Sequence, residues 1–509
     1  MRPNIVLILT DQHHIDALGH AGALPVHTPH IDRLAREGTR FSHAFCCAAI
    51  CSPSRAALFT GQWPHRFGYM GNEISLADPG RHLAQRMAEA DYRLGYIGKW
   101  HADESRMPTS LGFEGHDFPG YGNPGGFFRS EKQSRAQQLA LGPYYEYLVE
   151  NGYDVPHITH PVYTPGQRPR RLLSGRHSGP VESSIPWFLG TSACDQLRSF
   201  ARRGQHDGRP FFSWINFWGP HNPHVIPEPY DTMYDPASIP EPPSAGDPFE
   251  GKPHVQPRFS QFWGMYGEPW SAWQPHIAHY LGYVTLIDEQ VGRIRAALEE
   301  TGQWDSTLVV FAADHGDMLG RHQQIDKGPF AYDDIYRVPM IATGPGVARG
   351  HTCHELAYVQ ELFGTFVDTA TGQAPTNHDF GRSLRPYFTA DADHAAASGA
   401  TGRAGGGGGD GDGGGGGEGR EAVFTTYDSL VHLHFPHRAV RTRTHKYVYN
   451  STDRCELYDL ERDPHEMRNV VDDPAYADVK ADLKTRLLVH LQGVSDAASR
   501  RMAACYDWI

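Results

Sequence analysis

The chain begins with a continuous run of apolar residues, Ile5–Leu9, and this run constrains the fold more than any other segment. An unbroken apolar run of this length is typical of a strand covered on both faces, as in a parallel sheet. Helical patterns separate it from later strand candidates, and the clearest of them is His276–Glu300. The other buried-strand candidates are Tyr92–Ile97, Pro210–Phe217, Thr307–Ala312 and Val338–Thr343. Strands that alternate with helices in this way predict one large α/β domain around a mainly parallel sheet.

A glycine-rich tract interrupts this pattern, because 13 of the 18 residues from 402 to 419 are glycine. Such a tract cannot contribute to a packed core. Short β-rich runs and a helix near Lys480–Leu491 follow it. We therefore predict a large domain at 1–385, a flexible linker or insertion at 386–421, and a smaller α+β subdomain with a short antiparallel sheet at 422–509. The stretch Tyr121–Pro186 lacks clear periodicity and is expected to form long loops.

Composition excludes several classes of protein. The net charge of −13 argues against a general nucleic-acid binder, which needs a basic face. The opening apolar run is far shorter than the roughly 20 residues that span a bilayer. The first residues do not resemble a signal peptide, so we expect a soluble cytoplasmic protein without a membrane partner. Seven scattered cysteines do not form a disulfide framework.

Residues of metal-binding type follow two of the predicted strands. Asp11 and Gln12 come directly after the first strand, and Asp314 and His315 follow Thr307–Ala312. Ligands in open α/β sheets gather at the carboxyl ends of strands. The two pairs therefore fit one divalent cation, although the pair Asp11–Gln12 alone is more typical of a solvated loop.

The most specific motif is Cys51-Ser52-Pro53-Ser54-Arg55, followed by Thr60-Gly61. By itself, Cys51 could be a small buried residue before a helix. The pattern Cys-x-Pro-x-Arg with a trailing Thr-Gly resembles the signature of the type I sulfatases, which share the alkaline phosphatase-like fold. In that family a formylglycine-generating enzyme oxidises the cysteine to formylglycine. The resemblance implies this fold and a sulfuric ester hydrolase, with 1–385 as its catalytic domain.

Further segments fit the same resemblance in the same order along most of the chain. Gly98-Lys99-Trp100-His101 is similar to the family segment whose lysine and histidine face the substrate sulfate. Pro220-His221-Asn222-Pro223-His224 is similar to its Pro-His-x-Pro segment, and Lys327 matches the lysine that contacts the sulfate ester. The resemblance implies the catalytic residues Cys51, Arg55, Lys99, His101, His221 and Lys327 and the metal ligands Asp11, Gln12, Cys51, Asp314 and His315. Asn72 and His224 are separate candidates for substrate binding.

The resemblance also implies a mechanism. A formylglycine hydrate held at the metal attacks sulfur and forms a covalent sulfo-enzyme. His221, aided by Lys327, protonates the departing alcohol, and His101 then takes a proton from the second hydroxyl. Calcium is the expected ion, and manganese or a similar ion is an alternative because it accepts the imidazole of His315.

Two departures from the family pattern support an alternative activity. Many sulfatases have aspartate where this chain has Gln12 and asparagine where it has His315. The pairs Asp-Gln and Asp-His resemble those of phosphonate monoester or phosphodiester hydrolases in the same superfamily, whereas Lys99 and His101 favour a sulfatase. A third hypothesis, an inactive protein that binds sulfated ligands, is least favoured because no site residue is lost.

The expected substrate is a small-molecule or saccharide sulfate ester. The sequence leaves open whether the sulfate is on a sugar, an aryl group or an alkyl group, and it does not predict an oligomeric state. Several aromatic side chains fit a surface that stacks on a ring or, equally, a buried core: Tyr121, Phe127, Phe128, Tyr144, Tyr145, Trp263, Trp270 and Trp273.

Overall fold

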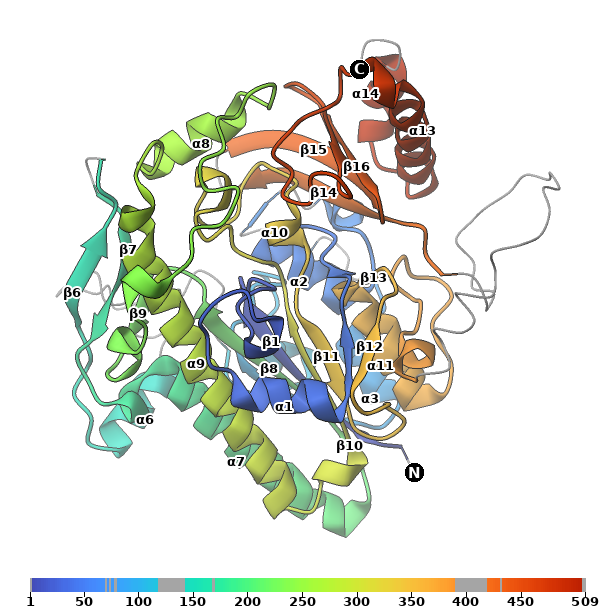
Figure 1. The fold of residues 1–509 in the computed structure, drawn as a ribbon. Helices are drawn as coiled ribbons and strands as arrows, with labels where there is room; N and C mark the ends of the chain where they lie inside the picture. Colours follow the sequence, from blue (N-terminus) through green and yellow to red (C-terminus); the bar gives the residue numbers. More distant parts are fainter. Residues whose placement is uncertain are drawn as a thin grey trace.

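The fold is known from a computed structural model, which describes residues 2–68, 71–72, 75–76, 80–117, 142–166, 170–389, 419–430 and 433–505. A sheet of eight strands lies at its centre (Figure 1), in the order β12-β2-β11-β10-β1-β8-β4-β5. The strands are β1 (Asn4–Asp11), β2 (Thr39–Phe41), β4 (Arg93–Gly98), β5 (Glu114–Gly115), β8 (Phe211–Pro220), β10 (Thr307–Ala313), β11 (Met340–Thr343) and β12 (His351–Cys353).

The middle of this sheet is parallel. Strand β1 pairs in parallel with β10 on one side and β8 on the other, and β4 pairs in parallel with β8. Strand β11 runs antiparallel to β10, so the sheet is mixed. The predicted fold class, a mainly parallel sheet with flanking helices and a smaller second sheet, is confirmed.

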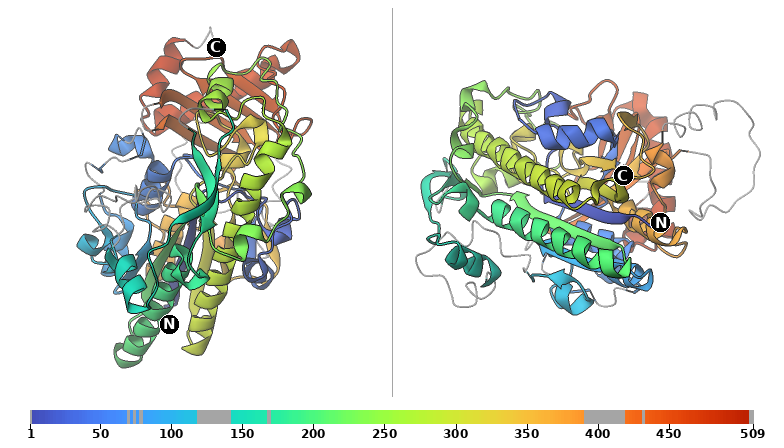
Figure 2. Two further views of the ribbon diagram at one scale, coloured as in Figure 1. Left: turned by 90° about the vertical axis from the view of Figure 1, so that its left-hand side faces the viewer. Right: turned by 90° about the horizontal axis from the view of Figure 1, so that it is seen from below.

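Helical layers cover both faces of the sheet, and this explains the unbroken apolar run Ile5–Leu9 in β1. Ile5, Leu7 and Leu9 point into a core with α2 (Cys51–Thr60), α3 (Leu83–Glu89) and α11 (Leu362–Thr371). Val6 and Ile8 point to the opposite face, where they pack with α1 (Pro29–Glu37), α7 (Ile185–Asp207) and α9 (Trp270–Glu300). Helices α7 and α9 lie side by side along that face (Figure 2). Every residue of β1 is therefore buried.

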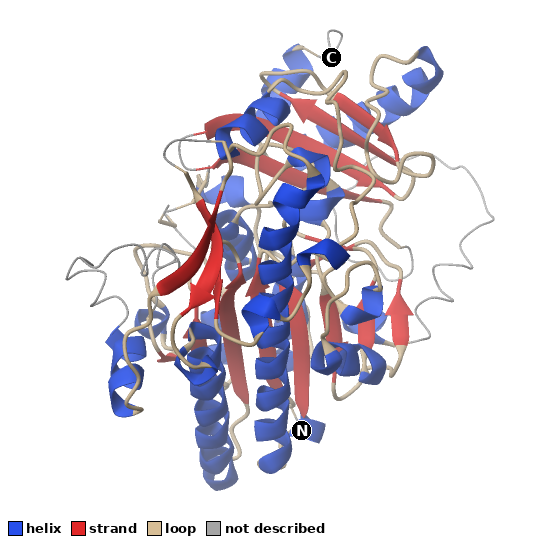
Figure 3. Ribbon diagram, turned by 60° about the vertical axis from the view of Figure 1, so that its left-hand side comes forward, coloured by secondary structure: helices blue, strands red, loops and turns tan. Residues whose placement is uncertain are grey.

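The expectation of long loops between Tyr121 and Pro186 is wrong for part of this stretch. The chain forms α6 (Gly142–Glu150), β6 (Ile158–Tyr163) and β7 (Leu172–His177), and β7 joins β9 (His224–Ile226) in a three-stranded sheet (Figure 3). Strand β6 is partly or fully exposed along its length, so it carries no apolar periodicity to signal a strand. The aromatic residues Tyr121, Phe127 and Phe128 lie outside the described residues.

The C-terminal part is an antiparallel sheet in the order β14-β15-β16-β17. Its strands are β14 (Ala422–Leu430), β15 (Leu433–Thr442), β16 (His445–Asn450) and β17 (Glu456–Asp459), followed by α13 (Ala477–Gly493) and α14 (Ala498–Ala504). One face packs against α13, whereas Val423, Ala439, Val448 and Tyr458 belong to the same core as β1. The C-terminal sheet is therefore built onto the large domain. The glycine-rich tract 402–418 lies outside the described residues.

Within the described parts of the chain, no helix is both long enough and apolar enough to cross a membrane.

Candidate active site

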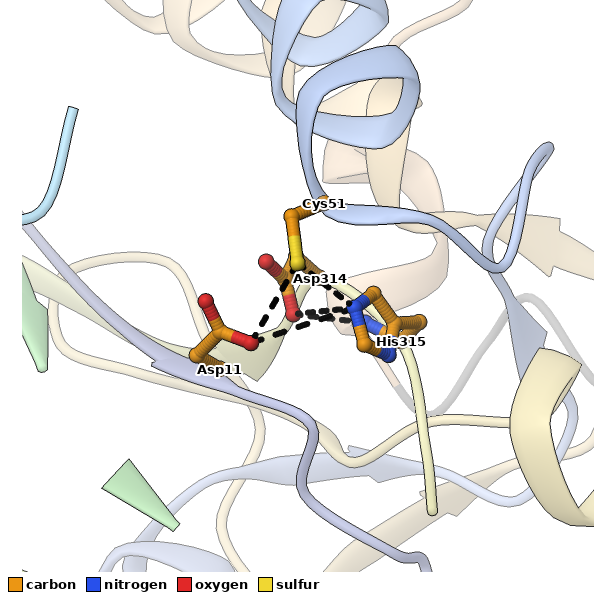
Figure 4. Close-up of side chains that lie close together, drawn as sticks. All are labelled: Asp11, Cys51, Asp314 and His315. Atoms are coloured by element: carbon orange, nitrogen blue, oxygen red, sulfur yellow. Dashed lines mark hydrogen bonds and ion pairs between the residues drawn. The ribbon is translucent and has the colours of Figure 1, made fainter. Parts of the chain in front are cut away.

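Four predicted site residues meet at the carboxyl edge of the central sheet. Asp11 ends β1, Asp314 and His315 directly follow β10, and Cys51 is the first residue of α2. One potential ligand atom from each side chain lies within 4.8 Å of those from the other three (Figure 4). All four side chains are buried, so they form an enclosed group of two carboxylates, an imidazole and a thiol.

The orientation of His315 suits a metal ligand. Its Nδ1 lies 2.9 Å from the carbonyl oxygen of Gly316, so Nδ1 donates a hydrogen bond and leaves the lone pair of Nε2 free. That Nε2 faces the Cys51 Sγ at 3.2 Å and lies 3.8 Å from a carboxylate oxygen of Asp11. The burial of Asp314, together with the Asp11 carboxylate, raises the pKa of Asp314. A divalent cation would relieve the repulsion between the carboxylates of Asp11 and Asp314. The donor set therefore fits a divalent cation.

Gln12, the fifth predicted ligand, is held by neighbouring polar groups. Its backbone N–H donates to Asp314 Oδ1 at 3.1 Å, and its Oε1 accepts a hydrogen bond from Lys327 Nζ at 2.8 Å. Its side-chain amide also donates to Asp317. Asp317, in the run Asp314-His315-Gly316-Asp317, is a site residue that was not predicted from the sequence. A second lone pair on Gln12 Oε1 remains for a cation.

Arg55 connects the elements that meet at this edge. Its Nε donates to Asp314 Oδ2 at 2.7 Å, and one terminal nitrogen lies 3.4 Å from Asp11 Oδ2. The other terminal nitrogen donates to the carbonyl of Lys99 at 3.1 Å and to Oδ1 of Asn216 at 3.0 Å. The ammonium group of Lys99 forms an ion pair with Asp11. Asn216, on β8, is a further site contact that the sequence analysis missed.

The surroundings of Cys51 favour an anion. Burial alone raises the pKa of its thiol, but the ammonium groups of Lys327 and Lys99 outweigh burial and lower the pKa well below the usual range. The side-chain oxygen of Asn72 accepts a hydrogen bond from the N–H of Ser52 at 3.1 Å. Asn72 therefore contacts the start of α2, whose dipole also favours negative charge beside Cys51.

His221 and Lys327 form a close pair. The Nε2 of His221 lies 2.7 Å from Lys327 Nζ, and its Nδ1 lies 2.6 Å from the carbonyl oxygen of Asn222. In this geometry Nδ1 donates a hydrogen bond to the Asn222 carbonyl, and Nε2 accepts a hydrogen bond from the ammonium group of Lys327. Burial lowers the pKa of Lys327, but the Asp326 carboxylate and the Cys51 group more than reverse this and raise it. Lys327 therefore holds the acidic proton of the pair.

The two remaining predicted histidines lie in different surroundings. His101 is 5% exposed, and its ring interacts with the side chain of Cys51. Burial lowers its pKa to about 4, so the ring is neutral near pH 7 and can accept a proton. His224 is fully buried and stacks on His276, with ring centroids 4.5 Å apart. Its ring is therefore enclosed in the interior.

The described aromatic residues are mostly part of the core. Tyr144 and Trp273 are each 2% exposed. Tyr145 packs against the core formed by α7 and α9. Trp263 and Trp270 are partly buried and pack against the core near α9. These five aromatic residues therefore belong to the core or pack against it, and not to a surface that stacks on a substrate ring.

Two family models match the chain. The model described as Sulfatase matches residues 3–372, and the model described as N-sulphoglucosamine sulphohydrolase, C-terminal, matches residues 417–492.

Among characterised relatives, the arylsulfatase of Clostridium perfringens is 28% identical, with 97% of this chain and 95% of that protein covered. The multifunctional alkaline phosphatase superfamily protein PehA of Trinickia caryophylli is 27% identical, with 96% and 95% covered. The N-acetylglucosamine-6-O-sulfatase of Bacteroides thetaiotaomicron is 25% identical, with 95% and 85% covered. The solved structure of a phosphonate monoester hydrolase from Silicibacter pomeroyi is 26% identical, with a TM-score of 0.73 and 96% and 95% covered.

Proposed function

Because the chain belongs to the sulfatase family and is a sulfuric ester hydrolase, we propose that Cys51 is oxidised to formylglycine and serves as its nucleophile. The observation that carries this proposal is the position of Cys51, which starts α2 within 4.8 Å of two carboxylates and an imidazole. A formylglycine-generating enzyme is the maturation partner. An unmodified thiol offers one nucleophilic atom, whereas a hydrated formylglycine offers two hydroxyl groups on one carbon.

Asp11, Asp314, His315 and residue 51 would hold one divalent cation, with Gln12 Oε1 as a further oxygen donor. When bound, this cation offsets the negative charge of the sulfuryl group and of the nucleophile. We propose calcium because oxygen donors predominate, and manganese is the alternative because it accepts the imidazole of His315.

In the first step, one hydroxyl group of the formylglycine hydrate would release its proton to solvent, and its oxygen would attack sulfur as the bond between sulfur and the ester oxygen breaks. The product is a covalent sulfo-enzyme and an alcohol. Lys99 and Lys327 stabilise the sulfuryl charge, and Arg55 keeps the two carboxylates in place. The proton held between Lys327 Nζ and His221 Nε2 passes to the departing oxygen.

In the second step, His101 accepts the proton of the remaining hydroxyl group. Its lowered pKa, about 4, keeps the ring neutral and able to accept this proton. The bond between the formylglycine carbon and the sulfate oxygen then breaks, sulfate leaves, and the aldehyde is restored. Addition of water regenerates the hydrate.

We propose a sulfated saccharide as the substrate. The support is the 25% identical relative named N-acetylglucosamine-6-O-sulfatase, which covers 95% of this chain. A second candidate function is the hydrolysis of phosphonate monoesters. It is favoured by Gln12 and His315, and by the TM-score of 0.73 to a phosphonate monoester hydrolase. Lys99 and His101 favour sulfate.

The test compares turnover of 4-nitrophenyl sulfate and of a phenylphosphonate monoester by protein produced with a formylglycine-generating enzyme. Mass spectrometry should detect formylglycine at position 51, and sulfate ester turnover should exceed phosphonate turnover. Cys51→Ala should stay folded without turnover, whereas Cys353→Ala, at a buried cysteine on β12, should remain active. Wild-type turnover in Cys51→Ala would refute the nucleophile. A reversed preference would favour the phosphonate monoester hydrolase.

A further inference from the structure

The segment 314–333 begins with two of the candidate metal ligands, Asp314 and His315, and contains Lys327 near its end. Four of its non-glycine residues have left-handed φ angles: Leu319 (44°), His322 (51°), Gln323 (50°) and Asp326 (67°). Such conformations are unfavourable and persist only where surrounding contacts impose them. The position of Lys327 therefore depends on what packs against this segment.

The C-terminal part supplies some of that packing through two buried residues, one on β16 and one in the chain that follows β17. The Nζ of Lys446, on β16, donates to the carbonyl oxygen of Ala331 at 2.8 Å and to Oε1 of Glu466 at 2.7 Å. The other carboxylate oxygen of Glu466 accepts the backbone N–H of Asp333 at 2.9 Å, and Lys446 also pairs with the Asp333 carboxylate at 2.5 Å. Lys446 and Glu466 are only 2% and 3% exposed. Together they bind main-chain atoms on both sides of Tyr332.

A second buried lysine, Lys252, contacts Tyr332 itself. Lys252 donates to the carbonyl oxygen of Glu466 at 2.7 Å and to the hydroxyl of Tyr332 at 3.1 Å, and it pairs with Asp247. The Tyr332 ring stacks on His322 with centroids 3.7 Å apart. Glu466 itself has a left-handed φ of 54°. The network therefore fixes Glu466 as well as the segment that Glu466 holds.

Only a few residues separate this network from the site. Ala331 lies four residues after Lys327, and the intervening main chain is tightly packed, because a Cβ at Gly328 would lie 2.7 Å from both the Phe259 and Phe330 rings. At the other end, Lys327 Nζ must stay 2.7 Å from His221 Nε2 and 2.8 Å from Gln12 Oε1. A shift of about 1 Å at a catalytic group can cost 100-fold in rate.

We propose that Lys446 and Glu466 are positioning residues, which hold the segment 326–333 so that Lys327 meets His221 in the geometry needed to protonate the leaving group. This inference rests on the proposed function, because it uses the role assigned there to the Lys327–His221 pair. It gives the C-terminal sheet a part in the reaction, although the sheet contributes no atom that touches substrate.

The test compares kcat of Lys446→Met on substrates with a poor and with a good leaving group. A poor leaving group, as in a sugar or alkyl sulfate, needs the proton, whereas 4-nitrophenolate needs little protonation. Lys446→Met should therefore reduce kcat roughly 10- to 100-fold more for an alkyl or sugar sulfate than for 4-nitrophenyl sulfate. Lys446→Arg keeps the charge and hydrogen bonds, and it should restore most of the ratio between the two substrates.

A matched control comes from a different ion pair between the C-terminal part and the large domain. Arg420 donates to both carboxylate oxygens of Glu361 at 2.9 and 2.7 Å, and these contacts do not involve the segment 326–333. Arg420→Met should lower the unfolding midpoint and leave the ratio of the two kcat values unchanged. Rates are compared per folded protein, below the unfolding transition of each variant.

Equal fold losses on both substrates in folded Lys446→Met would overturn the inference, because a purely structural role scales both rates alike. If that variant does not fold, Glu466→Gln, which keeps the shape of the side chain, is tested against the same two outcomes. Failure of the proposed function is distinguishable, since wild-type protein would then lack sulfatase turnover altogether.

Discussion

Asp11 and Asp314 lie close together but differ in their electrostatic surroundings. Burial and the Cys51 group act to raise the pKa of Asp11, but Lys99, His221 and Arg55 more than offset them and lower it. Burial and Asp11 raise the pKa of Asp314 despite its hydrogen bond with Arg55. Asp314 is therefore the carboxylate with the most to gain from a divalent cation, and it contributes one of only two carboxylates to the candidate metal site.

Asp314→Ala should consequently abolish both metal binding and turnover. Elemental analysis of the purified variant should find less than a tenth of the wild-type metal content, because even loss of a group that only orients a ligand costs about 10- to 100-fold in metal affinity or activity. Asp288→Asn is a suitable control, because Asp288 is buried at 1% exposure but accepts backbone N–H groups at the start of α1. Full metal occupancy in Asp314→Ala would disprove the assignment of this ligand.

His221→Ala should slow the hydrolysis of a sugar or alkyl sulfate by about 10²–10⁴-fold, the range for a lost general acid. An activated nitrophenyl sulfate should lose much less, because its leaving group needs little protonation. Steady-state kinetics on both substrates measure the difference. Equal losses would assign the acid role to Lys327 alone and leave His221 to bind sulfate.

The sequence predicted which residues converge better than it predicted how each one is oriented. Asp11 and Asp314 could be placed because each follows a predicted strand of the parallel sheet, and Cys51 could be placed because its motif resembles the sulfatase signature. The contact between Gln12 and Asp317 could not, because it depends on a left-handed φ of 65° at Gln12. Whether a histidine such as His224 faces solvent or the interior likewise depends on packing that one sequence does not specify.

At the scale of elements, continuous apolar runs identified the buried strands, and the carboxyl ends of β1, β4, β8 and β10 lie beside the site. The three-stranded sheet β6-β7-β9 was missed, because backbone pairing between an exposed strand and its neighbour leaves no pattern in the sequence. Gly98 marks the close approach of β4 and β8, but this role is clear only in the structure.

Gly98 ends β4 with a left-handed φ of 93°, and a Cβ there would lie 1.7 Å from the carbonyl oxygen of Asn216 on β8. Gly98→Ala should therefore destabilise the protein by roughly 2–4 kcal/mol, through strain and the forced separation of the strands. It should also displace Lys99 and reduce turnover per folded protein. Denaturant unfolding and kinetics measure the two effects.

The control for this change is Gly204→Ala, in α7. A Cβ at Gly204 meets only the Arg209 carbonyl oxygen at 3.5 Å, an ordinary contact. Alanine is favoured over glycine within a helix, so this variant should be stabilised by roughly 0.5–1 kcal/mol and remain fully active. Gly98→Ala with wild-type stability would show that β4 and β8 do not approach as closely as described.

At the scale of the whole molecule, the break in composition near residue 390 predicted a second structural unit but not how it is attached. Apolar residues on β14, β15, β16 and β17 complete the same core as β1, and buried lysines join the two parts through Asp333 and Glu466. The sequence shows only that such residues are apolar or charged. It does not show which residues they contact, because those residues lie more than a hundred positions away.

This shared core predicts that the protein unfolds as one cooperative unit. Calorimetry of metal-loaded protein should give a single transition whose calorimetric and van't Hoff enthalpies agree. Val448→Ala removes two methyl groups from the shared core, where Val448 is 1% exposed, and should shift the whole transition to lower temperature. Because the C-terminal sheet shares the core of the large domain, loss of sulfatase activity on heating should coincide with the unfolding transition of each protein. Two transitions, of which Val448→Ala moves only one, would instead mean that the C-terminal part unfolds separately and that the contacts across Asp333 do not couple it to the site.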